Sequence, residues 1–232
     1  MSRRRIYLLR HGEVPYFGPE RHERKEEIGL SEAGRAQARA AGRALAGIAF
    51  DKVVTSGLRR TVETAELVLE GAGGPAPGIE SWTGLHEIRA GSLAAVPDDD
   101  LERVFLDFLV PPVSLDDPFL EGETFRDLRG RVDPVVDELL GGSWGTLLLV
   151  AHGGVNRVIL SRALTEGKVM LGNLEQHPGC VNVLDVDVAP DGRERWAVHL
   201  VGWTPPDPVH ADRDTTTMED MLVQYRTAGR RQ

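Results

Sequence analysis

The sequence predicts an α/β fold in three layers, with a mostly parallel central sheet and helices on both of its faces. Short apolar runs, which are typical of buried strands, alternate along the chain with longer segments that are typical of helices. The two most apolar runs, at residues 6–9 and 146–150, are each followed closely by a histidine and a glycine. Ligands of such sheets bind beyond the carboxyl ends of the strands, so we expect a site at these two ends.

The first half of the chain contains the patterns of two strands and two helices. Residues 6–9 form an uninterrupted apolar run, which is typical of a parallel strand buried on both faces. Ser31 stands before an alanine- and arginine-rich segment at 32–45, and a serine in that position caps a helix. Residues 51–55 predict the second strand. Residues 58–69 predict the second helix, because a glycine- and proline-rich segment ends the pattern soon after them.

The second half continues the alternation. Residues 97–140 are mainly helical in pattern and are interrupted by two adjacent prolines. The most apolar strand follows at 146–150, and the pattern after it predicts a helix at 155–164. A Pro-Asp-Gly turn signal separates two later strands, which we expect at 181–188 and 196–201.

The length of 232 residues allows one sizeable hydrophobic core and does not require a second. We therefore expect a single domain over residues 1–204. From residue 205 onward the sequence is polar, contains several prolines and has a basic end. Residues 205–232 accordingly predict a polar, partly ordered C-terminal tail.

The charge balance limits the partners of the protein. A net charge of −9 makes nucleic acid and anionic membranes unfavourable partners, so an anionic small molecule would need a locally positive pocket. No run approaches the roughly 18 apolar residues of a membrane span, and we expect a cytoplasmic location. The single cysteine, Cys180, rules out an intramolecular disulfide and a zinc site of several cysteines, and we expect it to be buried in a strand.

The ends of the apolar strands carry residues suited to phosphoryl chemistry. A phosphate monoester carries nearly two negative charges at neutral pH, so cations must surround an attacking nucleophile. Arg10, Arg60 and His152 can supply them. Glycines at these positions would let the backbone approach phosphate oxygens: Gly12, Gly153 and Gly154.

His11 is the candidate nucleophile, because an imidazole can attack phosphorus in line and form a covalent phosphohistidine. The leaving alkoxide then needs a proton, which a carboxyl group near the pocket can give and later retrieve from the attacking water. Glu87 is the candidate for this acid and base, and Glu13, Glu121 and Glu123 stay alternatives.

Five segments resemble, in this order, the signature of the histidine phosphatase superfamily, also called the phosphoglycerate-mutase-like family. They are Leu-Arg-His-Gly-Glu at 9–13, the Thr-Ser-Gly-Leu-Arg-Arg-Thr-Val-Glu-Thr-Ala segment at 55–65, Leu-His-Glu at 85–87, Gly-Glu-Thr at 122–124 and Ala-His-Gly-Gly at 151–154. The resemblance extends from about residue 6 to about residue 203 and implies the phosphoglycerate-mutase-like fold.

The resemblance also implies a role for each matching residue. His11 matches the histidine that is phosphorylated in the family, and Arg10 and Arg60 match the arginines that bind the phosphoryl group. His152 matches the second histidine, which stabilises the transition state as a donor, and Glu87 matches the proton donor. Gly153 follows the second histidine, and we expect it to contact phosphate.

Two departures from the family bear on the reaction. Mutases of this family have an asparagine after Arg-His-Gly-Glu and a longer insertion with paired arginines between the acid and the second histidine. This chain reads Val-Pro-Tyr-Phe-Gly at 14–18, and Glu87 lies only 65 positions before His152, which favours water as the phosphoryl acceptor. The densely charged segment at 21–27 leaves the substrate open, and His22 within it is a candidate substrate contact.

The sequence thus predicts a phosphoric monoester hydrolase that acts on a small phosphorylated metabolite through a phosphohistidine on His11, with no cofactor and no metal ion. Two alternatives stay open: a 2,3-bisphosphoglycerate-dependent phosphoglycerate mutase and a non-catalytic phosphate-binding regulatory module. A homodimer and a substrate contact by Glu13 or His22 also stay open. We expect structural or exposed positions for the other histidines: His86, His177, His199 and His210.

Overall fold

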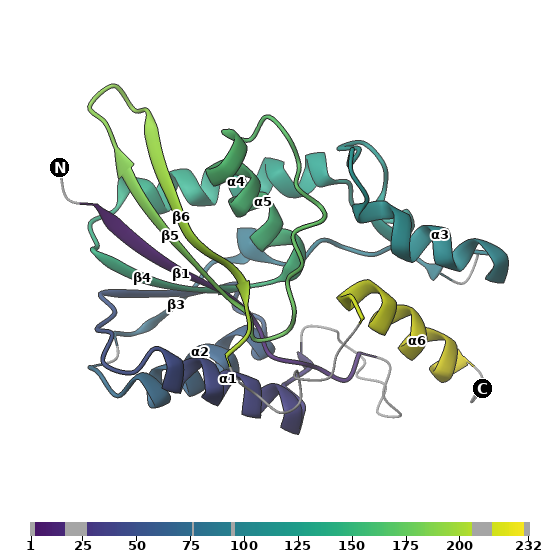
Figure 1. Cartoon of the computed structure of the whole chain (residues 1–232), viewed down its shortest axis with the longest axis horizontal. Coiled ribbons are helices and arrows are strands. Elements are labelled where there is room, and N and C mark those ends of the chain that lie inside the picture. Colours follow the sequence, from purple (N-terminus) through teal and green to yellow (C-terminus); the bar gives the residue numbers. More distant parts are fainter. Residues whose placement is uncertain (1–2, 17–26, 76, 94–95, 206–214, 230–232) are drawn as a thin grey trace.

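Six strands within the described residues form one mixed sheet with helices on both faces (Figure 1). The computed structural model describes residues 3–16, 27–75, 77–93, 96–205 and 215–229. The strands are β1 (Arg4–Arg10), β2 (Lys52–Thr55), β3 (Ile79–Ser81), β4 (Thr146–Ala151), β5 (Val181–Val188) and β6 (Glu194–Trp203). Their order is β3-β2-β4-β1-β5-β6: the first four are parallel neighbours, β5 pairs antiparallel with β1, and β6 pairs antiparallel with β5. The predicted fold class is confirmed.

The helices of the described residues surround this sheet. They are α1 (Glu32–Ala44), α2 (Arg59–Ala72), α3 (Leu101–Leu106), α4 (Phe125–Gly141), α5 (Gly153–Thr165) and α6 (Thr217–Gly229), with 3-10 turns at Thr83–Leu85, Asp98–Asp100, Asp107–Leu109 and Phe119–Glu121. Ser31 caps α1 as predicted, since its hydroxyl accepts a hydrogen bond from the Gly34 N–H at 3.0 Å. The interrupted helical region predicted at 97–140 consists of α3, α4 and several of these turns.

Burial on both faces explains the uninterrupted apolar run of β1. Tyr7 and Leu9 belong to a buried cluster with residues of α1 and α2. Ile6 and Leu8 point to the other side and pack in a second cluster with residues of α4 and α5. Because successive side chains of a strand alternate between faces, β1 can serve two helical layers only if all four positions are apolar.

The pairing of β1 with β4 aligns the two strand ends that the sequence singled out. In the parallel register Arg10 lies opposite Ala151. The chain continues the pairing by one more hydrogen bond, from the His11 N–H to the Ala151 carbonyl at 3.1 Å. His11 and His152 therefore leave the sheet side by side at its carboxyl edge.

A third apolar cluster joins two segments that are far apart in the sequence. Leu101 and Phe105 of α3 pack against Met218 and Leu222 of α6. Figure 1 shows α3 and α6 side by side, beyond the carboxyl ends of the parallel strands. The sequence predicted a polar, partly ordered tail at 205–232, and within the described residues 215–229 of this segment the structure has the packed helix α6. The proposed boundary after residue 204 stays a prediction.

The short edge strand β3 was not predicted, because its three residues show no burial pattern: Ile79 is half-buried and the next two residues are exposed.

Among the residues that the structure describes, no helix is long and apolar enough to cross a membrane.

Candidate active site

The two histidines that the sequence selected face each other at the carboxyl edge of the sheet. The ring centroids of His11 and His152 are 5.1 Å apart, with an interplanar angle of 67°. Both side chains are buried, at 1% and 0% exposure. The register of β1 and β4 places them, since each follows the last residue of its strand.

His11 has the protonation state of a nucleophile. Its Nδ1 lies 2.7 Å from the Gly12 carbonyl oxygen, and because a carbonyl can only accept, Nδ1 carries a proton. Burial, reinforced by the charges of Arg60 and Arg10, holds the pKa of His11 well below its usual value. The neutral ring therefore keeps a lone pair on Nε2. The hydroxyl of Tyr16 lies 3.4 Å from this nitrogen.

His152 is fixed by a neighbour that the sequence analysis did not select. Its Nε2 lies 2.8 Å from the Ser56 hydroxyl, which is also buried. Its Nδ1 is buried and has no hydrogen-bond partner among the described residues. Burial is the largest cause that lowers the pKa of His152, followed by His11 and Arg60. A buried ring nitrogen without a partner is costly unless a ligand satisfies it.

Arg10 and Arg60 place positive charge beside the two imidazoles. Arg10 is buried, and its Nη1 donates to the Gln176 carbonyl and, at 3.1 Å, to the Thr217 hydroxyl. Within the described part of the chain, Arg10 has no carboxylate at salt-bridge distance, and its buried Nε has no hydrogen-bond partner. Arg60 is buried in the first turn of α2, and its charge lowers the pKa of both histidines.

Glu87 reaches the same edge from a loop. Its carboxylate accepts from the Gly154 N–H at 3.0 Å and from the Ile88 N–H at 2.9 Å, so it lies at the start of α5, directly after His152. A Cβ at position 154 would lie 2.7 Å from Glu87 Oε1, so a larger residue there would displace this carboxylate. Gly153 opens the helix beside Arg10, whose Cζ would lie 3.7 Å from a Cβ at that position.

Arg131 of α4 holds the loop that carries Glu87. Its guanidinium donates to the carbonyls of Gly84 and Glu87 at 3.0 and 2.9 Å, and to that of His86. It also forms a bidentate pair with Glu123 at 2.9 Å. The sequence offered Glu123 as an alternative acid, but this pair, with a further hydrogen bond from the Arg89 N–H, holds the pKa of Glu123 low despite burial.

The other candidates have different positions. Glu13 accepts from the Ser31 hydroxyl at 3.0 Å, which ties it to the start of α1. His86 is half-buried, and its charge contributes to the low pKa of His152, so it lies nearer the site than predicted. His22 and His210 lie outside the described residues. Cys180 is buried as predicted, directly before β5, and burial raises its pKa to about 12.

Sequence reasoning missed four groups around the site. Ser56 lies inside the segment at 55–65 that resembles the family signature, which could have indicated it, and Tyr16 lies five positions after His11, so proximity in the chain could have indicated it. Gln176 and Thr217 lie 166 and 207 positions from Arg10, and no local pattern indicates their contact with it. The described residues contain no group of three or more His, Cys, Asp or Glu side chains that could hold a metal ion.

Comparisons with known proteins agree with this geometry. The family model described as "Histidine phosphatase superfamily (branch 1)" matches residues 6–202. A 2,3-bisphosphoglycerate-dependent phosphoglycerate mutase of Bradyrhizobium diazoefficiens is 30% identical over 69% of this chain and 81% of its own length. A glucosyl-3-phosphoglycerate phosphatase of Mycolicibacterium vanbaalenii is 31% identical over 67% and 72%.

Solved structures support the same assignment. A mycobacterial glucosyl-3-phosphoglycerate phosphatase, solved with VO3, has a TM-score of 0.67 and 26% identity and covers 88% of this chain and 100% of its own. The match to the family model confirms the resemblance, and the phosphatases among the relatives support the predicted phosphoric monoester hydrolase. The chain belongs to the histidine phosphatase superfamily, branch 1.

Proposed function

We propose that the protein hydrolyses a small phosphomonoester through a phosphohistidine on His11. The observation that carries this proposal is the pair of buried imidazoles, with centroids 5.1 Å apart, beside a buried arginine that has no carboxylate at salt-bridge distance in the described residues. Such a site binds a compact anion, because the anion supplies the negative charge that no described carboxylate places directly against this arginine.

In the first step, the Nε2 lone pair of His11 attacks phosphorus, and the bond from phosphorus to the leaving oxygen breaks. Arg10 and Arg60 bind the phosphoryl oxygens and balance the charge that develops on them. His152 donates a hydrogen bond to the same group. Glu87, in its protonated form, gives its proton to the leaving oxygen, so the product leaves as an alcohol.

In the second step, a water molecule attacks the phosphohistidine from the side that the alcohol has left. Glu87 is now a carboxylate and takes a proton from this water. The bond between Nε2 and phosphorus breaks, inorganic phosphate leaves, and His11 returns to its neutral form. Each group of the enzyme thereby recovers its starting protonation state.

The substrate class follows from the charge of the site and from the relatives. The relatives include enzymes named glucosyl-3-phosphoglycerate phosphatase and adenosylcobalamin/alpha-ribazole phosphatase. We therefore propose a phosphorylated metabolite whose non-phosphate half is larger than a simple alcohol. A panel of sugar phosphates, glycosylated phosphoglycerates, nucleotides and cofactor precursors would rank the candidates by kcat/KM.

The test is release of inorganic phosphate from an aryl phosphate in the presence of a chelator, with the His11→Asn variant as the control. The proposal expects release by the parent and none above background by the variant. Full dependence on added magnesium would contradict it. Rates at background for both parent and variant would favour a phosphate-binding module without catalysis, and equal rates above background would contradict the role of His11.

The mutase remains the second candidate, because several relatives carry that name. It predicts conversion of 3-phosphoglycerate to 2-phosphoglycerate, with catalytic 2,3-bisphosphoglycerate present, much faster than hydrolysis. Only 65 positions separate Glu87 from His152, whereas mutases have a longer insertion in this place, and the short connection favours the phosphatase. The same enzyme preparation, assayed for both reactions, decides between them.

A further inference from the structure

Helix α6 lies outside the residues that the family model matches, yet its first residue contacts the phosphate site. The family match ends at residue 202, and α6 begins at Thr217. The Thr217 hydroxyl lies 3.1 Å from Arg10 Nη1 and 2.5 Å from Glu175 Oε1. A hydroxyl has one hydrogen, and an ionised carboxylate can only accept, so Thr217 donates to Glu175 and accepts from Arg10.

Glu175 is itself anchored on its other side. Its second oxygen, Oε2, lies 3.8 Å from Nη2 of the buried Arg157. Arg157 in turn donates to the carbonyls of Gly172 at 2.8 Å and Gly153 at 3.2 Å. Although burial raises the pKa of Glu175, the hydrogen bond from Thr217 and the charge of Arg157 outweigh it and lower this pKa. The carboxylate thus stays ionised as the acceptor.

These contacts fix the Nη1 end of the Arg10 guanidinium and leave its Nε–H available. Nη1 is held by Thr217 and by the Gln176 carbonyl, whereas the buried Nε has no hydrogen-bond partner in the described residues. A guanidinium is a planar fork, so fixing Nη1 determines the directions in which the remaining N–H groups point. The hydroxyl of Thr217 is therefore placed to set the orientation in which Arg10 meets an anion.

The position of Thr217 is well defined by α6 itself. Thr216 and Glu219 form reciprocal side-chain to backbone hydrogen bonds: the Thr216 N–H donates to Glu219 at 2.6 Å, and the Glu219 N–H donates to Thr216 at 3.3 Å. Met218 and Leu222 are buried in the apolar cluster with α3. Capping and packing together hold the first turn of α6 against the site.

We propose that Thr217 is a positioning residue: through the chain Glu175–Thr217–Arg10, helix α6 orients the Arg10 guanidinium to receive the phosphoryl group. This inference rests on the proposed function only in that Arg10 is taken to bind the phosphoryl oxygens. The C-terminal segment lies outside the family signature, and by this inference it contributes to the phosphate site.

The test is calorimetric titration of the full chain with inorganic phosphate. Thr217→Val keeps the shape of the side chain but removes the hydroxyl, and Thr217→Ser keeps the hydroxyl. We expect Thr217→Val to weaken phosphate binding about tenfold, the size of one hydrogen bond to a charged group, and Thr217→Ser to stay within about twofold of the parent. Thr227→Val is the matched control, because that hydroxyl bonds only the Val223 carbonyl of its own helix among the contacts described, at 2.8 Å.

A double-mutant cycle separates positioning from general structure. If Thr217 acts through Arg10, Thr217→Val should have no further effect on phosphate affinity once Arg10 is changed to Gln. Unchanged affinity in Thr217→Val, an equal loss in Thr227→Val, or a full additional loss in the Arg10→Gln background would each overturn the proposal. A circular dichroism melt of every variant identifies a protein that has not folded. If Thr217→Val does not fold, Thr217→Ala, which also removes the hydroxyl, takes its place.

The titration does not depend on turnover, so the two proposals fail in different ways. A chain that binds phosphate but does not hydrolyse phosphomonoesters would end the proposed function and leave the role of Thr217 testable. For an active enzyme, Thr217→Val should lower kcat/KM about tenfold with an unchanged pH profile, because the hydroxyl does not take part in proton transfer.

Discussion

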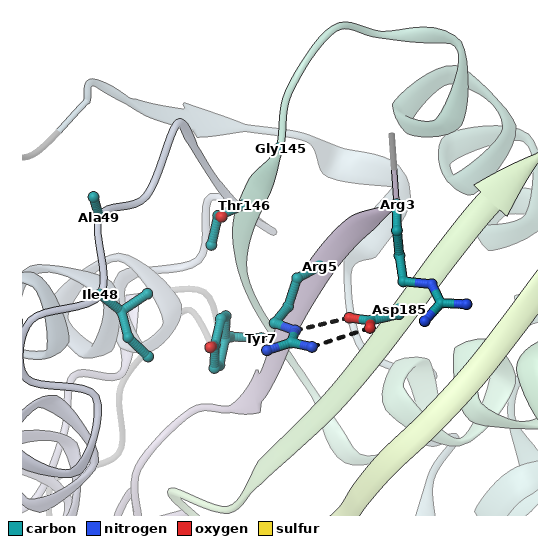
Figure 2. A pocket seen from close by; sticks show the side chains of 8 residues that line it. All are labelled: Arg3, Arg5, Tyr7, Ile48, Ala49, Gly145, Thr146 and Asp185. Carbon is teal, nitrogen blue, oxygen red and sulfur yellow. Dashed lines mark hydrogen bonds and ion pairs between the residues drawn. The ribbon is translucent and has the colours of Figure 1, made fainter. Parts of the chain in front are cut away.

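Strand β1 has arginines at both ends, and Arg5 near the amino end differs sharply in its contacts from Arg10 at the carboxyl end. At the amino end, Arg5 donates to Asp185 through Nε at 2.7 Å and Nη2 at 3.0 Å. Figure 2 shows this bidentate pair in a hollow that Tyr7 and Thr146 also line. At the carboxyl end, Arg10 is buried and its described partners are a carbonyl and a hydroxyl, not a carboxylate.

The carboxylates show the same contrast. Asp185 accepts from Arg5 and from His199 Nε2 at 2.9 Å, and the hydrogen bond from Arg5 is the largest cause that lowers its pKa. Glu87, at the carboxyl edge of the sheet, accepts from backbone N–H groups. One end of the sheet pairs its charges and gains stability. At the other end no described carboxylate pairs directly with Arg10, and the proposed function uses this guanidinium to bind a ligand.

Among the variants that compare the two ends of the sheet, Glu87→Gln gives the largest expected effect, because it removes the only proposed proton donor and leaves the fold intact. We expect roughly a 10³-fold loss in kcat on an alkyl phosphate, the range of general acid catalysis. The loss should shrink on an aryl phosphate, whose phenolate leaves without a proton. Steady-state kinetics on both substrates checks this, and Asp185→Asn should show neither loss. Equal losses on both substrates would remove Glu87 from its role as the acid.

Arg10→Gln is the next largest. Loss of one preorganised donor to the transferring group should lower kcat/KM about 10²-fold. The matched variant Arg5→Gln should leave kcat/KM within about twofold, because its guanidinium lies at the far end of the sheet. If both variants lose activity equally, the contrast between the two ends of β1 has no functional meaning.

The buried histidines make stability depend on pH. Their pKa values are well below 6.5 in the folded protein. Between about 6.5 and those lower values the unfolded chain binds more protons, so the free energy of unfolding falls as the pH falls through this window. His11→Asn should reduce the slope by up to about 1.4 kcal/mol per pH unit. Urea denaturation at pH 7.5, 6.5 and 5.5, which span this window, measures the slope. A slope equal to the parent's would show that His11 is not buried in its neutral form.

The smallest effect is expected at the amino end of β1, where Arg5 and Asp185 are paired. Asp185→Asn should destabilise the fold by about 1–2 kcal/mol, because it weakens hydrogen bonds to a partly exposed arginine. Arg10→Gln should cost less stability than this, since it removes a buried cation that lacks a paired carboxylate. Chemical denaturation of the two variants side by side compares them. A larger loss in Arg10→Gln would mean that Arg10 is mainly structural.

The central part of this arrangement could be predicted from the sequence. The uninterrupted apolar runs of β1 and β4 require burial on both faces, and their parallel pairing then brings His11 and His152 to one edge. Arg10 follows from the same rule. Glu87 lies in a loop without periodicity, so the residues alone offered it only as one carboxylate among several, and the family resemblance singled it out.

The missing parts depend on contacts that local patterns do not encode. Strand β3 has too few residues for an alternation to appear. The prolines and polar residues that precede helix α6 predict a polar tail and give no sign of this helix, although Met218, Leu222 and Tyr225 follow a helical spacing and pack on α3. The hydrogen bond from Arg10 to Thr217 spans 207 positions and becomes visible only once α6 is placed.

The most direct test of the account is to trap the phosphoryl group on the enzyme. The protein is mixed with a phosphomonoester, quenched with base within milliseconds to preserve phosphohistidine, digested and mapped by tandem mass spectrometry. We expect one phosphoryl group, on the peptide that contains His11, and none in His11→Asn. Rapid hydrolysis without any phosphoenzyme, or a phosphoryl group on another residue, would contradict it.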